Sequence, residues 1–180
     1  MTLHTIGHST HSLTRLVELL RAHGIECLAD VRTVPRSRRA PQFNRDALAE
    51  ELPPAGIEYV HLKELGGWRS PVAGLEDNAG WRNRSFRGYA DHLRSNEFAT
   101  GLARLLEVAA ERTTAVMCAE ASWWRCHRRL IADALLVRGW DVRHVGPDGR
   151  LTEHELTAFA VVGDEGELSY RAETGEQLGL

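Results

Sequence analysis

Short apolar runs alternate along the chain with segments whose apolar positions repeat at helical spacing. Strands are predicted over 2–6, 25–31, 57–61, 113–118 and 140–145, and helices over 13–23, 45–52, 86–95, 97–110 and 126–138. Strands that alternate with helices pair in parallel through right-handed crossovers. The pattern therefore predicts a single-domain, three-layer Rossmann-like α/β fold with a mostly parallel five-stranded sheet.

The run over 113–118 is continuously apolar at its centre, which is typical of a strand covered on both faces. Residues 62–85 are rich in Gly, Trp, Arg and Asn and predict a long loop, a feature that is usually functional or mobile. Residues 1–162 are predicted to form the domain, with a last short element between 151 and 162. Residues 163–180 are acidic and predict a mobile C-terminal tail, or an arm on a partner subunit.

The amino-acid composition is typical of a globular protein and bears on the compartment in which it is expected. The chain has 180 residues, of which 43% are hydrophobic and 26% are charged, enough for one core. No apolar run is long enough to cross a bilayer, and the start lacks the features of a signal peptide, so we expect a cytoplasmic protein without a membrane partner. Three cysteines fit a reducing compartment, and the net charge of −3 gives no general argument for nucleic acid.

Polar and titratable residues gather after the predicted strands, at one edge of the sheet. Ligands of open parallel sheets bind beyond the carboxyl ends of the strands, where helix N-termini also point. Candidate residues at this edge are His8 and Ser9 after the first strand, Arg32, Arg36 and Ser37 after the second, and Cys118, Glu120, Arg125, Cys126, His127 and Arg128 after the fourth. The loops at the opposite edge carry few polar or titratable residues. The contrast predicts one site, at the edge where the strands end.

The loop after the fourth strand carries the sharpest motif. A thiol at a strand end, followed by arginines at a helix start, meets charges and N–H groups that stabilise a thiolate or an oxyanion. Cys118 is therefore either a nucleophile or a packed thiol, and Cys126 is the alternative nucleophile. Glu120 could serve as an acid, a base or an arginine clamp, and His127 could shuttle a proton.

Two further groups allow two interpretations each, and a third group, of histidines, is not expected to bind a metal. The arginine-rich loop over 32–39 binds phosphate or a nucleic-acid backbone, or is simply solvated. Tryptophans at 68, 81, 123 and 124 either line a pocket that stacks a flat group or close the core. His4, His8 and His11 are not expected to converge, and no Cys-x-x-Cys or helical His-x-x-x-His pair is present, so no metal and no cofactor are predicted.

Several motifs occur in order between residues 2 and 145. They are Thr5-Ile6-Gly7-His8-Ser9, Asp30-Val31-Arg32, Pro35-Arg36-Ser37, Pro41-Gln42-Phe43-Asn44, Leu65-Gly66-Gly67, Phe86-Arg87-Gly88-Tyr89-Ala90-Asp91, Met117-Cys118-Ala119-Glu120 and Cys126-His127-Arg128. Together they resemble the bacterial and archaeal domain-of-unknown-function family numbered four-eighty-eight. The resemblance implies a compact α/β fold and a shared site, with Tyr89 and Asp91 near it, but no known reaction.

A weaker likeness of layout connects the chain with rhodaneses and cysteine phosphatases. Those enzymes carry a compact glycine-bearing loop between cysteine and arginine, whereas this chain has Glu120, Trp123 and Trp124 there. Two indoles and a carboxylate would narrow the loop and repel a dianion. Ordinary phosphatase or sulfurtransferase activity is therefore not expected.

Three functions remain open at this point. The first is an enzyme acting on a phosphate-bearing or nucleotide-like substrate, held by loop arginines. The second is a non-catalytic module for nucleic acid or nucleotide, and the third is a thiol-dependent sulfur or redox enzyme that uses Cys118 and Cys126. The expected partner is an anionic small molecule or nucleotide, and nucleic acid and a homodimer stay open as further partners.

Overall fold

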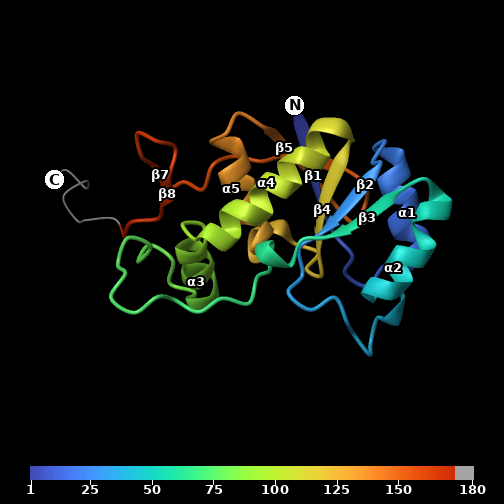
Figure 1. The fold of residues 1–180 in the computed structure, drawn as a ribbon, viewed down its shortest axis with the longest axis horizontal. Helices are drawn as coiled ribbons and strands as arrows, with labels where there is room; N and C mark the ends of the chain where they lie inside the picture. Colours follow the sequence, from blue (N-terminus) through green and yellow to red (C-terminus); the bar gives the residue numbers. More distant parts are fainter. Residues whose placement is uncertain (173–180) are drawn as a thin grey trace.

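A six-stranded sheet forms the centre of the molecule (Figure 1). The computed structural model of the chain describes residues 1–172. The strands, in the spatial order β3-β2-β4-β1-β5-β6, are β1 (Thr2–Gly7), β2 (Cys27–Asp30), β3 (Glu58–His61), β4 (Thr114–Cys118), β5 (Asp141–Val145) and β6 (Leu151–Glu153). The first five pair in parallel and β6 is antiparallel to β5. The predicted mostly parallel α/β fold is confirmed.

The predicted helices all form, with ends that differ by a few residues. They are α1 (Leu13–Ala22), α2 (Arg45–Glu51), α3 (Arg84–His92), α4 (Asn96–Glu111) and α5 (Arg128–Leu136). The Ser12 hydroxyl caps α1 by accepting a hydrogen bond from the backbone N–H of Arg15. The long loop between β3 and α3 also forms as predicted, broken only by a short 3₁₀ turn over Lys63–Leu65.

The helices cover the sheet in two layers, and β4 lies between them. Ala115 and Met117 of β4 pack in a core with α1 and α2. Val116 and Cys118 point the other way and pack in a core with α3, α4 and α5. This alternation turns the Cys118 thiol toward the N-terminus of α5.

The predicted count of five strands was one too low. A turn over residues 146–150 leads back into β6, which extends the sheet at its edge beside β5. All three residues of β6 are exposed, so the strand has no buried face and no alternating apolar pattern by which to recognise it.

Part of the segment expected to be a mobile tail packs on the domain. Val161–Val162 and Leu168–Ser169 form a small hairpin, β7–β8. Tyr170 is fully buried in the core with α3, α4 and α5. Tyr170 and the buried Leu168 thus anchor this acidic stretch, which differs from the expectation for residues 163–172. The rest of the predicted tail, 173–180, lies outside the described residues.

The carboxyl ends of the parallel strands meet at one edge of the sheet, as the sequence predicted. Gly7 at the end of β1 pairs with Cys118 at the end of β4, and Asp30 at the end of β2 pairs with both Met117 and His61. Loops that are far apart in the sequence therefore start side by side. Among residues 1–172, no helix has the length and apolar character needed to cross a membrane.

Candidate functional site

Two cysteines meet where β4 gives way to α5. Cys118 ends β4, and Cys126 lies two residues before the first residue of α5. Their Sγ atoms are 2.6 Å apart, and both side chains are buried, with 2% and 4% of their surface exposed. The seven intervening residues form a loop that includes a short 3₁₀ turn over Trp123–Arg125. The fold therefore brings both predicted thiols into direct contact.

His127 lies directly beside this pair. Its Nδ1 atom is 3.5 Å from Cys126 Sγ, and its Nε2 atom is 3.1 Å from the carbonyl oxygen of Val31 at the end of β2. An N–H at Nε2 that donates to this carbonyl leaves Nδ1 facing the thiol, ready to accept its proton. A Cβ atom on Gly67 would overlap the imidazole, so only glycine allows the loop after β3 to pass here.

Arg128 extends from the first turn of α5 beneath the thiols. Its side chain is buried, and Nη2 donates to the carbonyl oxygen of Glu120 at 2.5 Å while Nη1 lies 3.5 Å from Thr5 Oγ1. Within residues 1–172, no carboxylate oxygen lies within 4.0 Å of this guanidinium. Cys118 Sγ approaches the same Glu120 carbonyl, at 4.0 Å. A buried cation without a carboxylate is unfavourable unless another negative group balances it.

The two thiols respond to this environment in opposite directions. Burial and the hydrogen bond with Cys126 raise the pKa of Cys118 well above its ordinary value. Burial also opposes ionisation of Cys126, but the hydrogen bond with Cys118 and the charges of His127 and Arg128 outweigh it and lower its pKa well below the ordinary value. Of the two thiols, Cys126 is therefore the one whose ionisation its surroundings favour.

A chain of buried polar side chains fixes Thr5 behind Arg128. Thr5 Oγ1 is 2.7 Å from His144 Nδ1, His144 Nε2 is 3.1 Å from His154 Nδ1, and His154 Nε2 is 2.9 Å from Asp133 Oδ1. With both imidazoles neutral, His154 donates to the Asp133 carboxylate and accepts from His144, which accepts from the Thr5 hydroxyl, and the Thr5 oxygen keeps a lone pair for Arg128. Burial lowers the pKa of His144 to about 3, so the chain stays uncharged at that ring.

Arg32, at the end of β2, is bound quite differently. Its guanidinium makes a two-pronged ion pair with Asp30, at 2.8 and 2.6 Å, and also donates to the carbonyl oxygen of Phe43. His8 stacks on the Phe43 ring and contacts Arg32 through Nε2 at 3.3 Å. Burial and the neighbouring Arg32 charge lower the pKa of His8 to about 4, so this imidazole is neutral.

Two cavities adjoin the thiols. The larger, of 530 Å³, is lined by Gly67, Trp68, Arg69, Ser70, Ser85, Phe86, Tyr89, Glu120, Arg125, Cys126 and His127. The smaller, of 200 Å³, is lined by Arg32, Thr33, Val34, Gly67, Trp68, Cys118, Ala119, Glu120, Cys126 and His127. Both contain Cys126, His127 and the exposed indole of Trp68, so a ligand in either one reaches the thiol pair.

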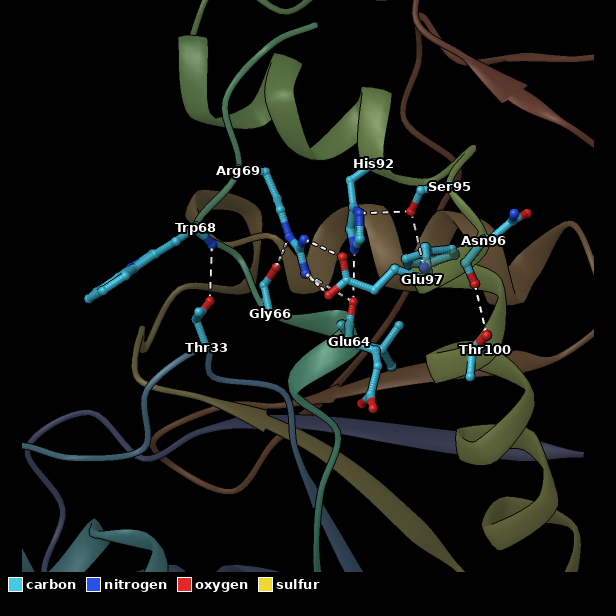
Figure 2. A network of polar contacts seen from close by, with 12 residues as sticks. Thr33, Glu64, Gly66, Trp68, Arg69, His92, Ser95, Asn96, Glu97 and Thr100 are labelled. Atoms are coloured by element: carbon cyan, nitrogen blue, oxygen red, sulfur yellow. Dashed lines mark hydrogen bonds and ion pairs between the residues drawn. The ribbon is translucent and has the colours of Figure 1, made fainter.

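A polar network holds the wall of the larger cavity in place (Figure 2). Arg69 donates to both carboxylate oxygens of Glu97, at 2.7 and 2.9 Å, and to the carbonyl oxygens of Gly66 and Glu64. The Trp68 backbone N–H donates to Thr33 Oγ1 at 3.2 Å, while its indole extends away from the network (Figure 2). Arg69 is thus engaged by the fold, and Trp68 is left free to contact a ligand.

Other predicted residues fall into three places. Tyr89 lines the larger cavity with its ring 5.0 Å from that of His127, but its hydroxyl donates to the carbonyl oxygen of Leu65. Asp91 lies outside the cavity lining and accepts hydrogen bonds from the Val72 backbone and the Asn78 amide, which fold the long loop. Ser9, with a φ of 46°, donates through its N–H to Ala119 of the loop that follows β4.

The arginine-rich loop has a hollow of its own. Arg36, Ser37 and Arg38 line a hollow of 600 Å³ that has no cysteine in its wall. Ser37 Oγ accepts from the N–H groups of Arg39 and Ala40, so this hydroxyl shapes its own loop. Arg36 and Ser37 are therefore not brought together with the thiols, although the same loop starts from Arg32.

The tryptophans divide between the two predicted roles. Trp68 alone among the four lines a cavity beside the thiols. Trp81 packs in the core beside Phe86, and Trp123 stacks on His144 at 4.0 Å, which shields the buried chain of polar groups. Trp124 is exposed. Two of the four indoles, Trp81 and Trp123, therefore close the structure, and Trp68 offers a stacking surface beside the thiols.

Comparison with known families identifies the relatives of this chain. The family model described as Domain of unknown function DUF488 matches residues 12–135. The chain belongs to the DUF488 family. The match ends within α5, so it includes the whole Cys118–Arg128 segment of this DUF488 protein but not His144 or His154. No match was found among curated proteins or among solved structures.

Sequence reasoning missed the groups that support Arg128. Thr5 and His144 lie within apolar strands, and Asp133 lies on the buried side of α5. A polar residue inside an apolar pattern is the available signal, because a buried polar group needs a partner. That signal marks each residue separately and does not reveal that they join into one chain.

Proposed function

We propose that this DUF488 protein is a thiol-dependent enzyme in which the Cys126 thiolate is the nucleophile. The observation that carries the proposal is the buried Arg128 guanidinium, which has no carboxylate within 4.0 Å among residues 1–172 and lies next to the thiol pair. A thiolate at Cys126 balances this charge, and it is the form of cysteine that attacks electrophiles. A merely packed pair of thiols would leave the guanidinium unbalanced.

Each neighbour of Cys126 has a role in this proposal. His127 takes the thiol proton at Nδ1 and holds it as imidazolium, with its ring oriented by the Val31 carbonyl. Arg128 is a positioning and charge-balancing residue, fixed by Thr5 and the Glu120 carbonyl. The 530 Å³ cavity lies in the range of small-molecule sites and gives the substrate access to Cys126.

Alkylation kinetics test the proposal. Native protein is treated with iodoacetamide over a range of pH, and modified cysteines are located by mass spectrometry. We expect fast modification at Cys126 near neutral pH, lost in Cys126→Ser and kept in Cys27→Ser. Cys27 is a matched control because it is fully buried in β2, where burial raises its pKa to about 12. Alkylation of Cys126 no faster than of an unfolded thiol would contradict the proposal.

A specific observation also favours an anionic group on the substrate. Arg125 is exposed in the wall of the larger cavity and, within the described part of the chain, makes no ion pair, whereas Arg32 and Arg69 are each paired with a carboxylate. Trp68 offers an exposed indole in the same cavity. We therefore keep a phosphate-bearing or nucleotide-like substrate as the second candidate.

Protection of the thiol tests this second candidate. A nucleoside diphosphate that binds beside Arg125 should slow iodoacetamide modification of Cys126, and Arg125→Ala should remove the protection. Arg38→Ala is the matched control, because Arg38 is exposed in a different hollow. Protection that persists in Arg125→Ala but is lost in Arg38→Ala would favour the arginine-rich loop and the nucleic-acid binding module.

A further inference from the structure

The two cysteines differ in their access to the cavities. Cys126 lines both cavities, whereas Cys118 lines only the smaller one. A molecule in the larger cavity therefore reaches Cys126 first. Cys118 contacts Cys126 from the end of β4, and because the two sulfur atoms already touch, they can be joined with little movement of β4 or α5.

The charge of Arg128 gives the two thiols an order of reaction. While Cys126 is a thiolate, it balances the guanidinium, and Cys118 stays protonated. Once Cys126 carries a substituent it is neutral, and Arg128 again lacks a counter-charge. Cys118 Sγ approaches the same Glu120 carbonyl oxygen as Arg128 Nη2, so it is the next group that can ionise there.

We infer that Cys118 is the resolving thiol, and that the enzyme reduces a small organic disulfide while Cys118 and Cys126 become a disulfide. This inference rests on the proposed function of Cys126 as nucleophile. It goes further by assigning a role to Cys118 and a class to the substrate.

The steps balance as thiol–disulfide exchange. The Cys126 thiolate attacks one sulfur of the substrate, forms a mixed disulfide and releases the other half as a thiolate, which takes up a proton from His127 or water. Cys118 then loses its proton to solvent through the smaller cavity and attacks Cys126 Sγ. The second half of the substrate leaves as a thiolate and is protonated, and an external thiol reductant restores the two cysteines.

The larger cavity indicates what the substrate carries on either side of its sulfur–sulfur bond. Its walls present one carboxylate, that of Glu120, and the guanidinium of Arg125, together with the hydroxyls of Ser70 and Ser85, whereas Arg69 in the same wall is already paired with Glu97. A carboxylate and an ammonium group on one molecule complement this pair of charges. The chemistry therefore favours a zwitterionic, amino-acid-like disulfide.

Mass spectrometry of the reduced protein mixed with cystine tests the inference. We expect wild-type protein to lose two hydrogen atoms in mass and to keep no adduct, with a disulfide between Cys118 and Cys126 after digestion. Cys118→Ser should stop at a cystine-derived mixed disulfide on Cys126, with Cys118→Ala as a second variant. Cys27→Ser should behave as wild type, and bis(hydroxyethyl) disulfide should react roughly tenfold more slowly than cystine.

The outcomes separate the two proposals. A wild-type protein that keeps the mixed disulfide on Cys126 as long as Cys118→Ser does would overturn the resolving role and leave Cys126 as a nucleophile. If Cys126 reacts with cystine and with iodoacetamide no faster than the thiol of an unfolded chain does, both proposals are wrong. Equal rates with the charged and the uncharged disulfide would overturn the zwitterionic class alone.

Discussion

Arg32 and Arg128 are two buried arginines at the same edge of the sheet, and the fold treats their charges in opposite ways. Arg32 is held by both carboxylate oxygens of Asp30, which precedes it by two residues. Arg128 is held by a carbonyl oxygen and a hydroxyl, and within residues 1–172 no carboxylate reaches it. The first charge is neutralised inside the fold, and the second remains available to stabilise an anion.

The comparison shows that an arginine in a cavity wall is not by itself an anion site. Arg32 lines the smaller cavity, but its charge is already matched by Asp30. Arg128 lines neither cavity, yet its unmatched charge lies behind the thiols that do. The electrostatic effect on the site therefore comes from the arginine that a ligand cannot touch.

The largest expected effect comes from removing the matched arginine. Arg32→Met leaves the buried Asp30 carboxylate without its cation, which should lower the free energy of unfolding by about 3–5 kcal/mol. Denaturant unfolding measures this change. Arg36→Met, at an exposed position of the same loop, is the control and should change stability by less than about 0.5 kcal/mol. Equal losses in the two variants would break the comparison.

Removing the unmatched arginine should change reactivity more than stability. In Arg128→Met, the Cys126 thiolate loses its fully buried cation, and we expect iodoacetamide modification near neutral pH to slow about a hundredfold. Arg125→Met is the matched control, because Arg125 lines the cavity but is exposed. If modification of Cys126 slows a hundredfold in Arg125→Met and not at all in Arg128→Met, then Arg125, and not Arg128, stabilises the thiolate.

The same ionisation should make stability depend on pH. A thiol whose pKa is lower in the folded protein than in the unfolded chain stabilises the fold above its folded pKa, and this contribution grows up to the unfolded value, about 8.5. As the pH falls through the folded pKa, the contribution is lost. The stability difference between wild type and Cys126→Ser should therefore rise as the pH increases toward about 8.5. A flat difference in denaturant titrations would argue against a folded-state thiolate.

A smaller effect is expected from the imidazole. His127→Gln removes the charge next to Cys126 Sγ but keeps a polar group near the Val31 carbonyl. Cysteine modification should slow roughly tenfold, less than in Arg128→Met. The reason is that His127 is partly exposed to water, which screens the interaction between its charge and the thiolate. His23→Gln is the matched control, because His23 is also partly exposed with its Nε2 atom 2.9 Å from a backbone carbonyl oxygen, that of Gly149, but lines neither cavity beside the thiols. If cysteine modification slows as much in that control as in His127→Gln, or more, then His127 is not the proton acceptor.

The sequence predicted the parallel fold because its signals are local. The apolar run of β4 and the apolar face of α1 are visible in short windows, and the loops after β1, β2 and β4 duly start at one edge. A short element between 151 and 162 was expected, but neither its pairing as the edge strand β6 nor the anchoring role of Tyr170 could be predicted, because neither residue stretch has an amphipathic pattern. Their positions depend on packing against residues that are distant in the sequence.

The site was predictable only in part. Cys118, Cys126, His127 and Arg128 stand close together in the sequence, so their common location could be expected. The electrostatic relation between the thiols and Arg128 could not be expected, because it depends on which arginine forms an ion pair with a carboxylate in the folded protein. Asp30 near Arg32 was a visible signal, whereas the support of Arg128 by Thr5 requires the pairing of β1 with β4 and the course of α5.

Thiolate absorbance in the ultraviolet, followed as a function of pH, tests the central claim most directly. The account predicts a wild-type transition well below the ordinary thiol pKa that disappears in Cys126→Ser, moves upward in Arg128→Met and stays in place in Cys27→Ser. A single wild-type transition at or above the ordinary thiol pKa, unchanged by Arg128→Met, would contradict a Cys126 thiolate as the counter-charge of Arg128.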